Sequence, residues 1–371
     1  MKRSNNRVVR WFGLLMLSAA ILAPANAAET SHASVARSET PGRVVIAPGF
    51  DAAGDFSDGM AAVRVGGRWG FIDRSGTMVI RPRFADRDAP FSARFSDGLA
   101  AIRFGDKWGF IDRKGKTVIE PRFGGDDYSP PVFSEGLCAV RDGYKYGYID
   151  RAGNFVIAPK FDKASNFAEG AAVVQEDDGT KAYIDKKGEY LSPLRFKHAA
   201  PFREGLAAVQ IDGSYGYIDH SGKLAIAPRF DEASSFSDGV AAVRTDERFG
   251  YIDKTGRTVL EPKFDGAVLN LLGESFAEGY IAVELGGSTK FAGPIGKFGF
   301  MDKSGKLVIQ PNFNSASNFS EGLASVSVDG KFGFIDKTGA FAIAPRFTDA
   351  SSYSEGLARV RIGKKYGFIA R

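Results

Sequence analysis

Cysteine and histidine are nearly absent from this sequence, which has one Cys and three His among 371 residues. A lone cysteine cannot form an intramolecular disulfide, so the fold must be held together by packing. We expect Cys138 to be a small buried apolar side chain, because corresponding segments of the chain carry alanine there. His32, His198 and His220 lie outside any nucleophile, zinc or calcium-loop motif. We therefore expect no cofactor, no metal site and no catalytic residues.

A long apolar run is also missing. The longest one follows a basic head and ends before Ala25-Asn26-Ala27. At roughly a dozen residues it is shorter than the about 20 that a membrane-spanning helix needs. A basic head, a short apolar middle and an A-x-A end are the parts of a secretory signal. We expect residues 1–27 to be a cleaved signal peptide and residues 28–43 a flexible lead-in. The exported chain would be periplasmic or secreted, with no membrane span after cleavage.

Excess positive charge is confined to the same segment. Its removal lowers the formal net charge from +5 to +1, because it carries Lys2, Arg3, Arg7 and Arg10. No other block of Lys and Arg replaces it. A basic surface for DNA or RNA is therefore not expected, and nucleic acid is excluded as a partner.

What the sequence has in abundance is Phe (31) and Gly (45), and both recur in fixed patterns. Phe-x-Asp/Glu-Gly occurs nine times, starting at Phe56, Phe95, Phe133, Phe167, Phe202, Phe236, Phe276, Phe319 and, with tyrosine in first place, Tyr353. An aromatic–Gly pair followed by aromatic-Ile-Asp comes about 14 residues later; the pairs are Trp69-Gly70, Trp108-Gly109, Tyr146-Gly147, Tyr215-Gly216, Phe249-Gly250, Phe298-Gly299, Phe332-Gly333 and Tyr366-Gly367. The fourth unit departs from this pattern at Ala182. A third pattern, apolar-Ile-x-Pro-x-Phe, follows, and the undisturbed period is 34 residues.

Residues 107–115, KWGFIDRKG, carry the pattern most fully. Because the three patterns recur in this fixed order, the chain resembles the WG-repeat family, also written KWG. The resemblance covers residues 44–371. It implies a bacterial-type repeat protein and the role of the aromatic–Gly pairs as a structural signature. It does not imply a reaction or a ligand.

The sequence pattern of each unit predicts a three-stranded antiparallel meander. In unit two, residues 98–104 and 107–112 form a hairpin, and residues 117–119 form a third strand closed by Pro121. Trp108 and Phe110 share one face of their strand, since side chains alternate. We expect such aromatic residues mainly to fill the core between stacked units. The glycine between them avoids blocking a neighbouring ring or strand.

The ends of the chain indicate how the array is arranged. Unit nine lacks its third strand, and an unassigned third strand, residues 44–50, precedes unit one. We therefore predict an all-β protein of nine meanders in a closed or nearly closed propeller-like ring, forming one repeat domain over residues 44–371. The alternative is an open twisted β-solenoid, because nine units exceed the usual four to eight blades of a propeller.

Insertions interrupt the repeats in four places, between Phe84 and Phe95, Phe123 and Phe133, Phe264 and Phe276, and Gly279 and Asp302. The last includes Lys290, Phe291 and Pro294, which form the candidate binding loop.

Three functions are compatible with these features. The first is an exported, non-enzymatic scaffold that binds a protein partner in the cell envelope. The second is a glycan- or cell-wall-binding module that uses Trp69, Trp108, Tyr146 and Tyr215 as exposed stacking platforms. The third is a hydrolase that uses carboxylates in a central channel.

Overall fold

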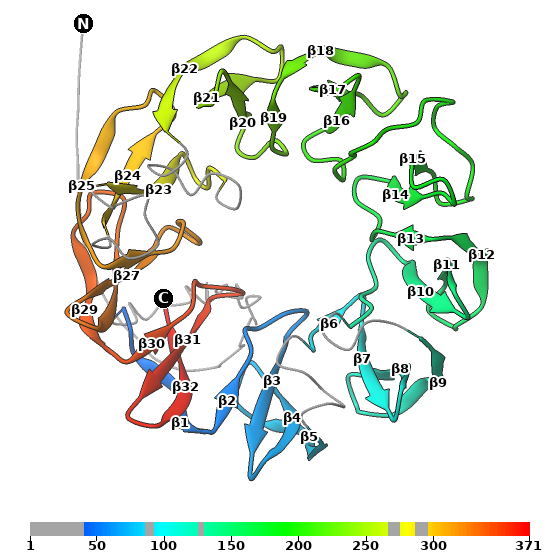
Figure 1. The fold of residues 1–371 in the computed structure, drawn as a ribbon. Helices are drawn as coiled ribbons and strands as arrows, with labels where there is room; N and C mark the ends of the chain where they lie inside the picture. Colours follow the sequence, from blue (N-terminus) through cyan, green and yellow to red (C-terminus); the bar gives the residue numbers. More distant parts are fainter. Residues whose placement is uncertain (1–40, 86–92, 125–129, 266–274, 286–295) are drawn as a thin grey trace, which may run out of the picture. The chain divides into compact units, whose positions relative to one another are not determined.

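A computed structural model describes residues 41–85, 93–124, 130–265, 275–285 and 296–371. These residues form thirty-two strands and no helix. The strands make nine antiparallel sheets, which follow one another around a ring and form a nine-bladed β-propeller (Figure 1). The described residues include no helix of the length and hydrophobicity needed to span a membrane.

Within each unit, the strands follow one another in sequence order from the centre of the ring to its outer edge, and β1 completes unit nine as its outer strand (Figure 1). Unit one consists of β2 (Ala52–Ala53), β3 (Met60–Val65), β4 (Arg68–Asp73) and β5 (Met78–Phe84); unit two of β6 (Phe95–Ser96), β7 (Leu99–Phe104), β8 (Lys107–Asp112) and β9 (Thr117–Phe123); unit three of β10 (Cys138–Asp142), β11 (Lys145–Ile149) and β12 (Phe155–Phe161). Unit four has β13 (Lys163–Ala164), β14 (Ala172–Gln175) and β15 (Lys181–Ile184); unit five β16 (Ala207–Ile211), β17 (Ser214–Ile218) and β18 (Leu224–Phe230); unit six β19 (Glu232–Ala233), β20 (Val240–Thr245), β21 (Arg248–Asp253) and β22 (Thr258–Asp265). Unit seven has β23 (Tyr280–Leu285), β24 (Lys297–Asp302) and β25 (Leu307–Phe313); unit eight β26 (Ser315–Ala316), β27 (Ala324–Val328), β28 (Lys331–Ile335) and β29 (Phe341–Phe347); unit nine β30 (Asp349–Ala350), β31 (Leu357–Ile362), β32 (Lys365–Ala370) and β1 (Val44–Phe50).

The meander of unit two matches the sequence prediction, with two additions. β9 continues past Pro121 to Phe123, so the prediction that the proline closes the strand is wrong. The ladder pairs Phe110 with Ile119 and Trp108 with Phe123, which leaves a bulge around the proline. Proline is tolerated because β9 is the outermost strand. No further strand pairs with it, so the backbone hydrogen bond that proline cannot donate is not required. The second addition is a short innermost strand, β6. Five of the nine sheets have four strands, and in each of them the extra strand is the innermost one.

The turn between the last two strands is closed by its aspartate. Asp112 Oδ1 accepts hydrogen bonds from the amides of Lys114 and Lys116, both at 2.9 Å. An aspartate that caps its own backbone in this way is typical turn chemistry, and it accounts for the recurrence of Asp in the Ile-Asp-x-x-Gly turns.

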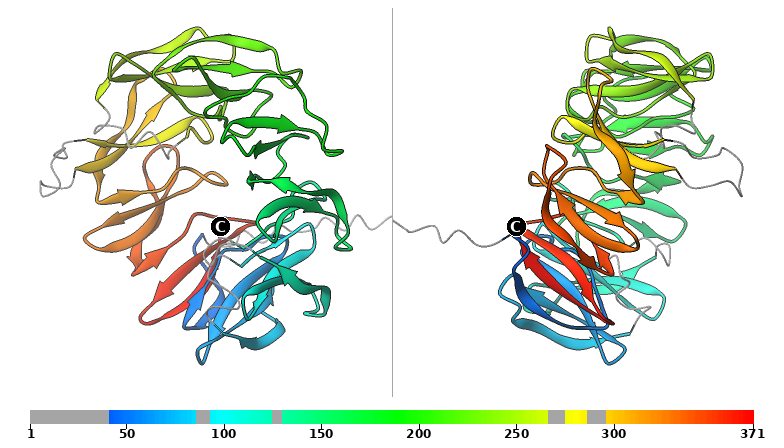
Figure 2. Two further views of the ribbon diagram at one scale, coloured as in Figure 1. Left: turned by 45° about the vertical axis from the view of Figure 1, so that its right-hand side comes forward. Right: turned by 90° about the vertical axis from the view of Figure 1, so that its left-hand side faces the viewer.

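The two ends of the described chain close the ring. β1 is the outer strand of unit nine, in the order β1-β32-β31-β30, and Val44 pairs with Ile369 (Figures 1 and 2). The Gly42 amide donates to the Ala370 carbonyl (3.1 Å), and the Ala370 amide donates to the Arg43 carbonyl (2.9 Å). These two bonds reproduce the turn that other units build from one continuous segment. The closed arrangement predicted from residues 44–50 is confirmed, and the open solenoid is wrong.

The hydrophobic core lies between units rather than within them. Nine clusters of buried residues occupy the nine unit interfaces, so each sheet is packed on both faces. Every interface has an aromatic pair at 4.9–5.1 Å between ring centroids; the pairs are Phe71–Phe95, Phe110–Phe133, Tyr148–Phe167, Tyr183–Phe202, Tyr217–Phe236, Tyr251–Phe276, Phe300–Phe319, Phe334–Tyr353 and Phe368–Phe56. Cys138 is fully buried in the interface between units two and three, as predicted.

Close backbone packing explains the glycine of the aromatic–Gly pair. A Cβ at Gly109 would lie 2.7 Å from the Ile119 carbonyl oxygen and 2.8 Å from the Pro121 nitrogen. Unit four has Ala182 at this position, and it is the unit that forms no continuous outer strand. Its outer segment contacts β15 only at separate points, such as the reciprocal bonds between Lys181 and Phe196 (2.8 and 2.9 Å). In the other units the outer strand passes so close to this position that only glycine fits without displacement of the backbone.

Candidate functional site

Because neighbouring strands of a sheet are antiparallel, the connections between them lie alternately at two opposite faces of the ring. The turn face carries the Phe-x-Asp/Glu-Gly and Ile-Asp-x-x-Gly turns. The hairpin face carries the hairpins between the two central strands and the links between units. Each insertion starts where a strand ends at the hairpin face, after β5, β9, β22 or β23. The predicted binding loop at Lys290, Phe291 and Pro294 lies outside the described residues.

At the turn face, the acid of each Phe-x-Asp/Glu-Gly turn contacts the next unit. Glu135 Oε2, for example, accepts a hydrogen bond from the Gly170 amide (3.0 Å) and pairs with Lys186 Nζ (3.0 Å). The amide bond recurs at all nine interfaces: Asp58–Gly98, Asp97–Gly136, Glu135–Gly170, Glu169–Gly205, Glu204–Gly239, Asp238–Gly279, Glu278–Gly322, Glu321–Gly356 and Glu355–Gly59. We call this bond the carboxylate contact.

The carboxylate contact is formed at a conformational cost. All nine acids have φ between 51° and 56°, the left-handed region, which costs a residue with a Cβ about 1–2 kcal/mol. Asn or Gly would suit that backbone better. Their absence from the position is the signal that the carboxylate itself is required. Their role between units is not visible in the local sequence, because the two partners of each contact, such as Glu135 and Gly170, are 35 residues apart.

A serine hydroxyl adds a second bond between most units. Ser134 Oγ donates to the Phe167 carbonyl of the next unit (2.7 Å). The same bond is made by five other serines: Ser57, Ser96, Ser237, Ser320 and Ser354. Units four, five and seven carry Ala168, Arg203 and Ala277 instead. These three units therefore lack the serine bond to the next unit.

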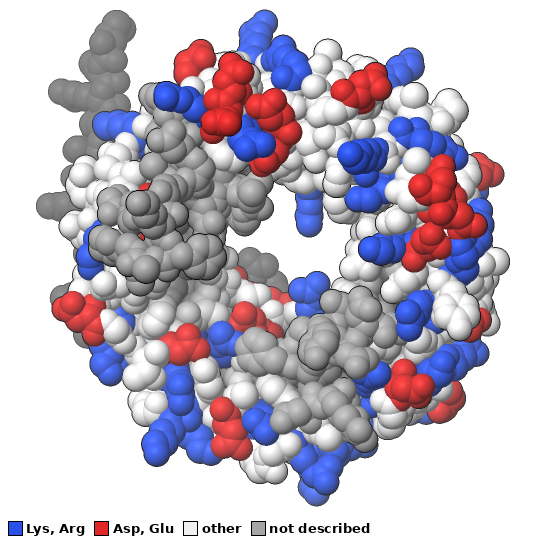
Figure 3. Space-filling model, viewed as in Figure 1, with Lys and Arg blue, Asp and Glu red and all other residues white. Residues whose placement is uncertain are grey.

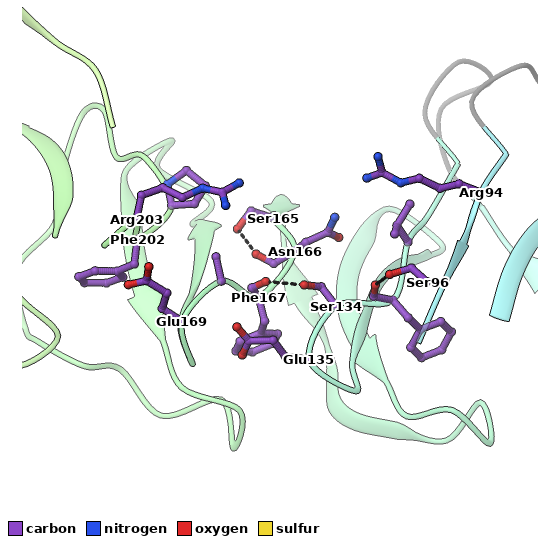
Figure 4. A pocket seen from close by; sticks show the side chains of 14 residues that line it. Arg94, Ser96, Ser134, Glu135, Ser165, Asn166, Phe167, Glu169, Phe202 and Arg203 are labelled. Atoms are coloured by element: carbon purple, nitrogen blue, oxygen red, sulfur yellow. Dashed lines mark hydrogen bonds between the residues drawn. The ribbon is translucent and has the colours of Figure 1, made fainter. Parts of the chain in front are cut away.

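A pocket of about 520 Å³ lies where two of those departures occur (Figure 4). Its lining comes from the Phe-x-Asp/Glu-Gly turns of units two to five and the residues just before them. These segments follow the innermost strands, so the pocket lies at the inner rim of the ring. Figure 3 shows that the centre of the ring is open and that Lys and Arg side chains border the opening. Arg94 and Arg203 extend toward the pocket from opposite sides, above Ser165 and Asn166 (Figure 4).

The acids and bases of the pocket differ in how they are compensated. Burial raises the pKa of Glu135, but hydrogen bonds from Lys186 and the Gly170 amide outweigh it and leave the pKa below its usual range. Glu169 accepts bonds from the Glu204 and Gly205 amides (2.5 and 2.8 Å). The side chains of Arg94 and Arg203, by contrast, are exposed and form no hydrogen bond or ion pair within the part of the chain that the structure describes.

The aromatic–Gly pairs do not form a stacking platform. Trp69, Trp108 and Phe249 are buried, and the other five aromatic side chains (Tyr146, Tyr215, Phe298, Phe332 and Tyr366) are only partly exposed. Their glycines, as at Gly109, pack against the outer strand. The glycan hypothesis required exposed rings at these positions, and that expectation is wrong.

The described residues give no support to the hydrolase hypothesis. They contain no group of three or more His, Cys, Asp or Glu side chains placed to hold a metal ion. A carboxylate-dependent hydrolase also needs one carboxyl whose pKa is raised so that it can act as an acid. Of the two pocket glutamates, Glu135 has a lowered pKa, and Glu169 is engaged in the carboxylate contact.

Comparison with known proteins follows the same nine-fold division. The pattern of the WG containing repeat matches residues 41–69, 69–108, 108–146, 146–179, 182–215, 215–248, 249–288, 298–332 and 332–366. No curated protein matches the sequence. A solved structure titled "Crystal structure of the eukaryotic initiation factor" is 13% identical, with 81% of this chain and 89% of that chain covered and a TM-score of 0.55. At that identity the likeness concerns the fold alone.

Two further solved structures resemble the chain less closely. BamB from Moraxella catarrhalis is 10% identical, with 77% of this chain and 97% of that chain covered and a TM-score of 0.42. The C-terminal WD40 domain of Sif2 is 10% identical, with 88% and 97% covered and a TM-score of 0.43.

Proposed function

Because the chain belongs to the family of WG-containing repeat proteins, we propose that it is an exported, non-enzymatic scaffold that binds a protein partner in the cell envelope. The observation that carries the proposal is the inner-rim pocket, toward which the unpaired side chains of Arg94 and Arg203 extend. A repeat ring supplies a rigid frame, and its departures from the repeat are where binding is added.

Export is supported by residues 1–27, whose basic head, apolar middle and A-x-A end fit a secretory signal. The proposal predicts that the protein purified from the envelope or medium begins at Ala28. Intact-mass measurement of the fractionated protein tests this. A full-length chain retained in the cytoplasm would contradict export.

Protein binding at the pocket is tested by site-specific photocrosslinking in the native host. A photoreactive phenylalanine analogue replaces Asn166, which is exposed at the pocket. The matched control places it at Leu224, which is 48% exposed on the outer strand β18. We expect a protein adduct from the pocket position and none from the outer strand. No adduct, or the same adducts from both positions, would overturn the proposal.

A further inference from the structure

We propose that the inner-rim pocket binds an acidic protein segment, with one carboxylate held by Arg94 and another by Arg203. This inference rests on the proposed function and specifies the chemistry of the partner. The two guanidinium groups enter the same cavity from unit two and unit five, with units three and four between them (Figure 4).

The charge balance of the pocket favours an anion. Of its two glutamates, Glu135 pairs with Lys186 (3.0 Å), and Glu169 accepts hydrogen bonds from the amides of Glu204 and Gly205 (2.5 and 2.8 Å). Two guanidinium groups therefore face one carboxylate, Glu169, that has no lysine or arginine partner in the described part of the chain, which leaves the pocket with a net positive charge. A guanidinium forms two parallel hydrogen bonds with a carboxylate, which are shorter and stronger than bonds between neutral groups.

The nine units provide an internal reference for what the ring itself needs. The residue after the aromatic of the turn is serine or alanine in eight units, and only unit five has a long charged side chain there, Arg203. The residue before that aromatic is uncharged or acidic in eight units, and only unit two has a cation, Arg94. In unit five the arginine also replaces the serine that would bond to the next unit. Both arginines therefore serve something other than the scaffold.

The lining of the pocket favours a peptide over a sugar or a nucleic acid. The three phenylalanine rings that line it (Phe133, Phe167 and Phe202) are no more than 2% exposed, so they offer no face for stacking a sugar or a base. The accessible groups are the two guanidinium groups and small polar side chains such as Ser165 and Asn166. Such groups suit carboxylates spaced along an extended chain, together with its peptide groups.

The test uses the mature protein and a fluorescently labelled hexaglutamate peptide, with hexaglutamine as the uncharged comparison. The double variant Arg94→Ser, Arg203→Ser installs residues that other units carry at these positions. We expect hexaglutamate affinity to fall about tenfold for each arginine removed, measured by fluorescence anisotropy, because each charge-assisted pair is lost. The control variant Lys331→Ser, Lys364→Ser removes two exposed charges from the hairpins of units eight and nine and should leave the affinity unchanged.

A second measurement separates binding from folding. Arg203→Ser restores a serine that is able to donate to the Phe236 carbonyl, so its midpoint of urea unfolding should not fall while its affinity does. The inference is overturned if hexaglutamate does not bind, if hexaglutamine binds equally well, or if the control lowers affinity as much as the pocket variant. It is also overturned if heparin binds more tightly than the peptide through the same arginines. Any of these results alongside a pocket-specific crosslink would leave the proposed function standing.

Discussion

The interface between units four and five is expected to open before any other interface in the ring. Ala168 stands where serine donates to the next unit elsewhere, and His220 stands where other units carry Lys or Arg. The His220 Nε2 lies 3.8 Å from the Glu169 carboxylate, farther than the 3.0 Å that separates Lys186 from Glu135 at the preceding interface. The sheet of unit four also lacks an outer strand. Three stabilising features are therefore weakened at one interface.

Restoring two of these features should stabilise the interface by a calculable amount. Ala168→Ser recreates a hydroxyl-to-carbonyl bond of the kind that Ser134 makes at 2.7 Å, worth about 0.5–1.5 kcal/mol. His220→Lys recreates an ion pair with Glu169; both side chains are over a third exposed, so solvent screening limits the pair to about 0.2–1 kcal/mol. The double variant should be stabilised by about 0.7–2.5 kcal/mol, which slows opening between about threefold and about seventyfold.

Amide hydrogen exchange followed by mass spectrometry measures this opening directly. Peptides covering β14, β15 and β16 should exchange faster than the equivalent peptides at other interfaces. The double variant should slow them, and Ser134→Ala should speed exchange at the interface of units three and four. If the four–five peptides exchange no faster than the rest, or if the double variant leaves them unchanged, the reasoning from hydrogen bonds and charge is wrong.

Three further predictions follow from the turns and the ring closure. The pKa values of Asp73 and Asp253 lie below the ordinary 3.8, chiefly through hydrogen bonds from the hydroxyls of Ser75 and Thr255. Lowered carboxyl pKa values stabilise the fold above the unfolded-state pKa, and that stabilisation is lost as pH falls through the folded one. The melting temperature by circular dichroism should therefore be level above about pH 5 and fall below about pH 4. Gly109→Ala should destabilise by more than about 2 kcal/mol in urea titrations, because its Cβ would lie 2.7 Å from the Ile119 carbonyl oxygen. A circular permutant that joins Arg371 to Pro41 and opens between Arg113 and Lys114 should fold with an unfolding midpoint close to that of the parent, since Gly42 and Ala370 already meet in one turn.

Controls for these predictions come from the same repeats. Gly66→Ala is the partner of the Gly109 variant, because a Cβ at Gly66 meets nothing within 4 Å and only its φ of 57° opposes the change. Equal losses from both variants would refute the packing argument. An unfolded permutant would show that the contacts of Gly42 and Ala370 do not replace a continuous turn. A melting temperature that rises toward pH 3 would contradict the assignment of the turn aspartates.

Local features of this fold were predictable because they depend on near neighbours in the sequence. Alternation and turn residues located β8 at the residues where it lies, and the unassigned strand at 44–50 identified the closure of the ring. The continuation of β9 past Pro121 was missed because it depends on the strand being outermost. The carboxylate contact was missed because its two partners meet only when units pack side by side. Arg94 and Arg203 lie in units two and five, and only the curvature of the ring brings them to one pocket.

The position of that pocket connects binding with the stability of the ring. Its lining includes Glu169 from unit four and Phe202 and Arg203 from unit five, on the two sides of the interface expected to open first. An acidic segment that reaches from Arg94 to Arg203 would therefore contact both sides of that interface. A ligand that binds only the closed ring stabilises the closed ring by its own binding free energy. Because this interface lacks the serine bond and carries a histidine, we expect the partner to slow its opening more than the opening of an interface that keeps both the serine and the lysine or arginine.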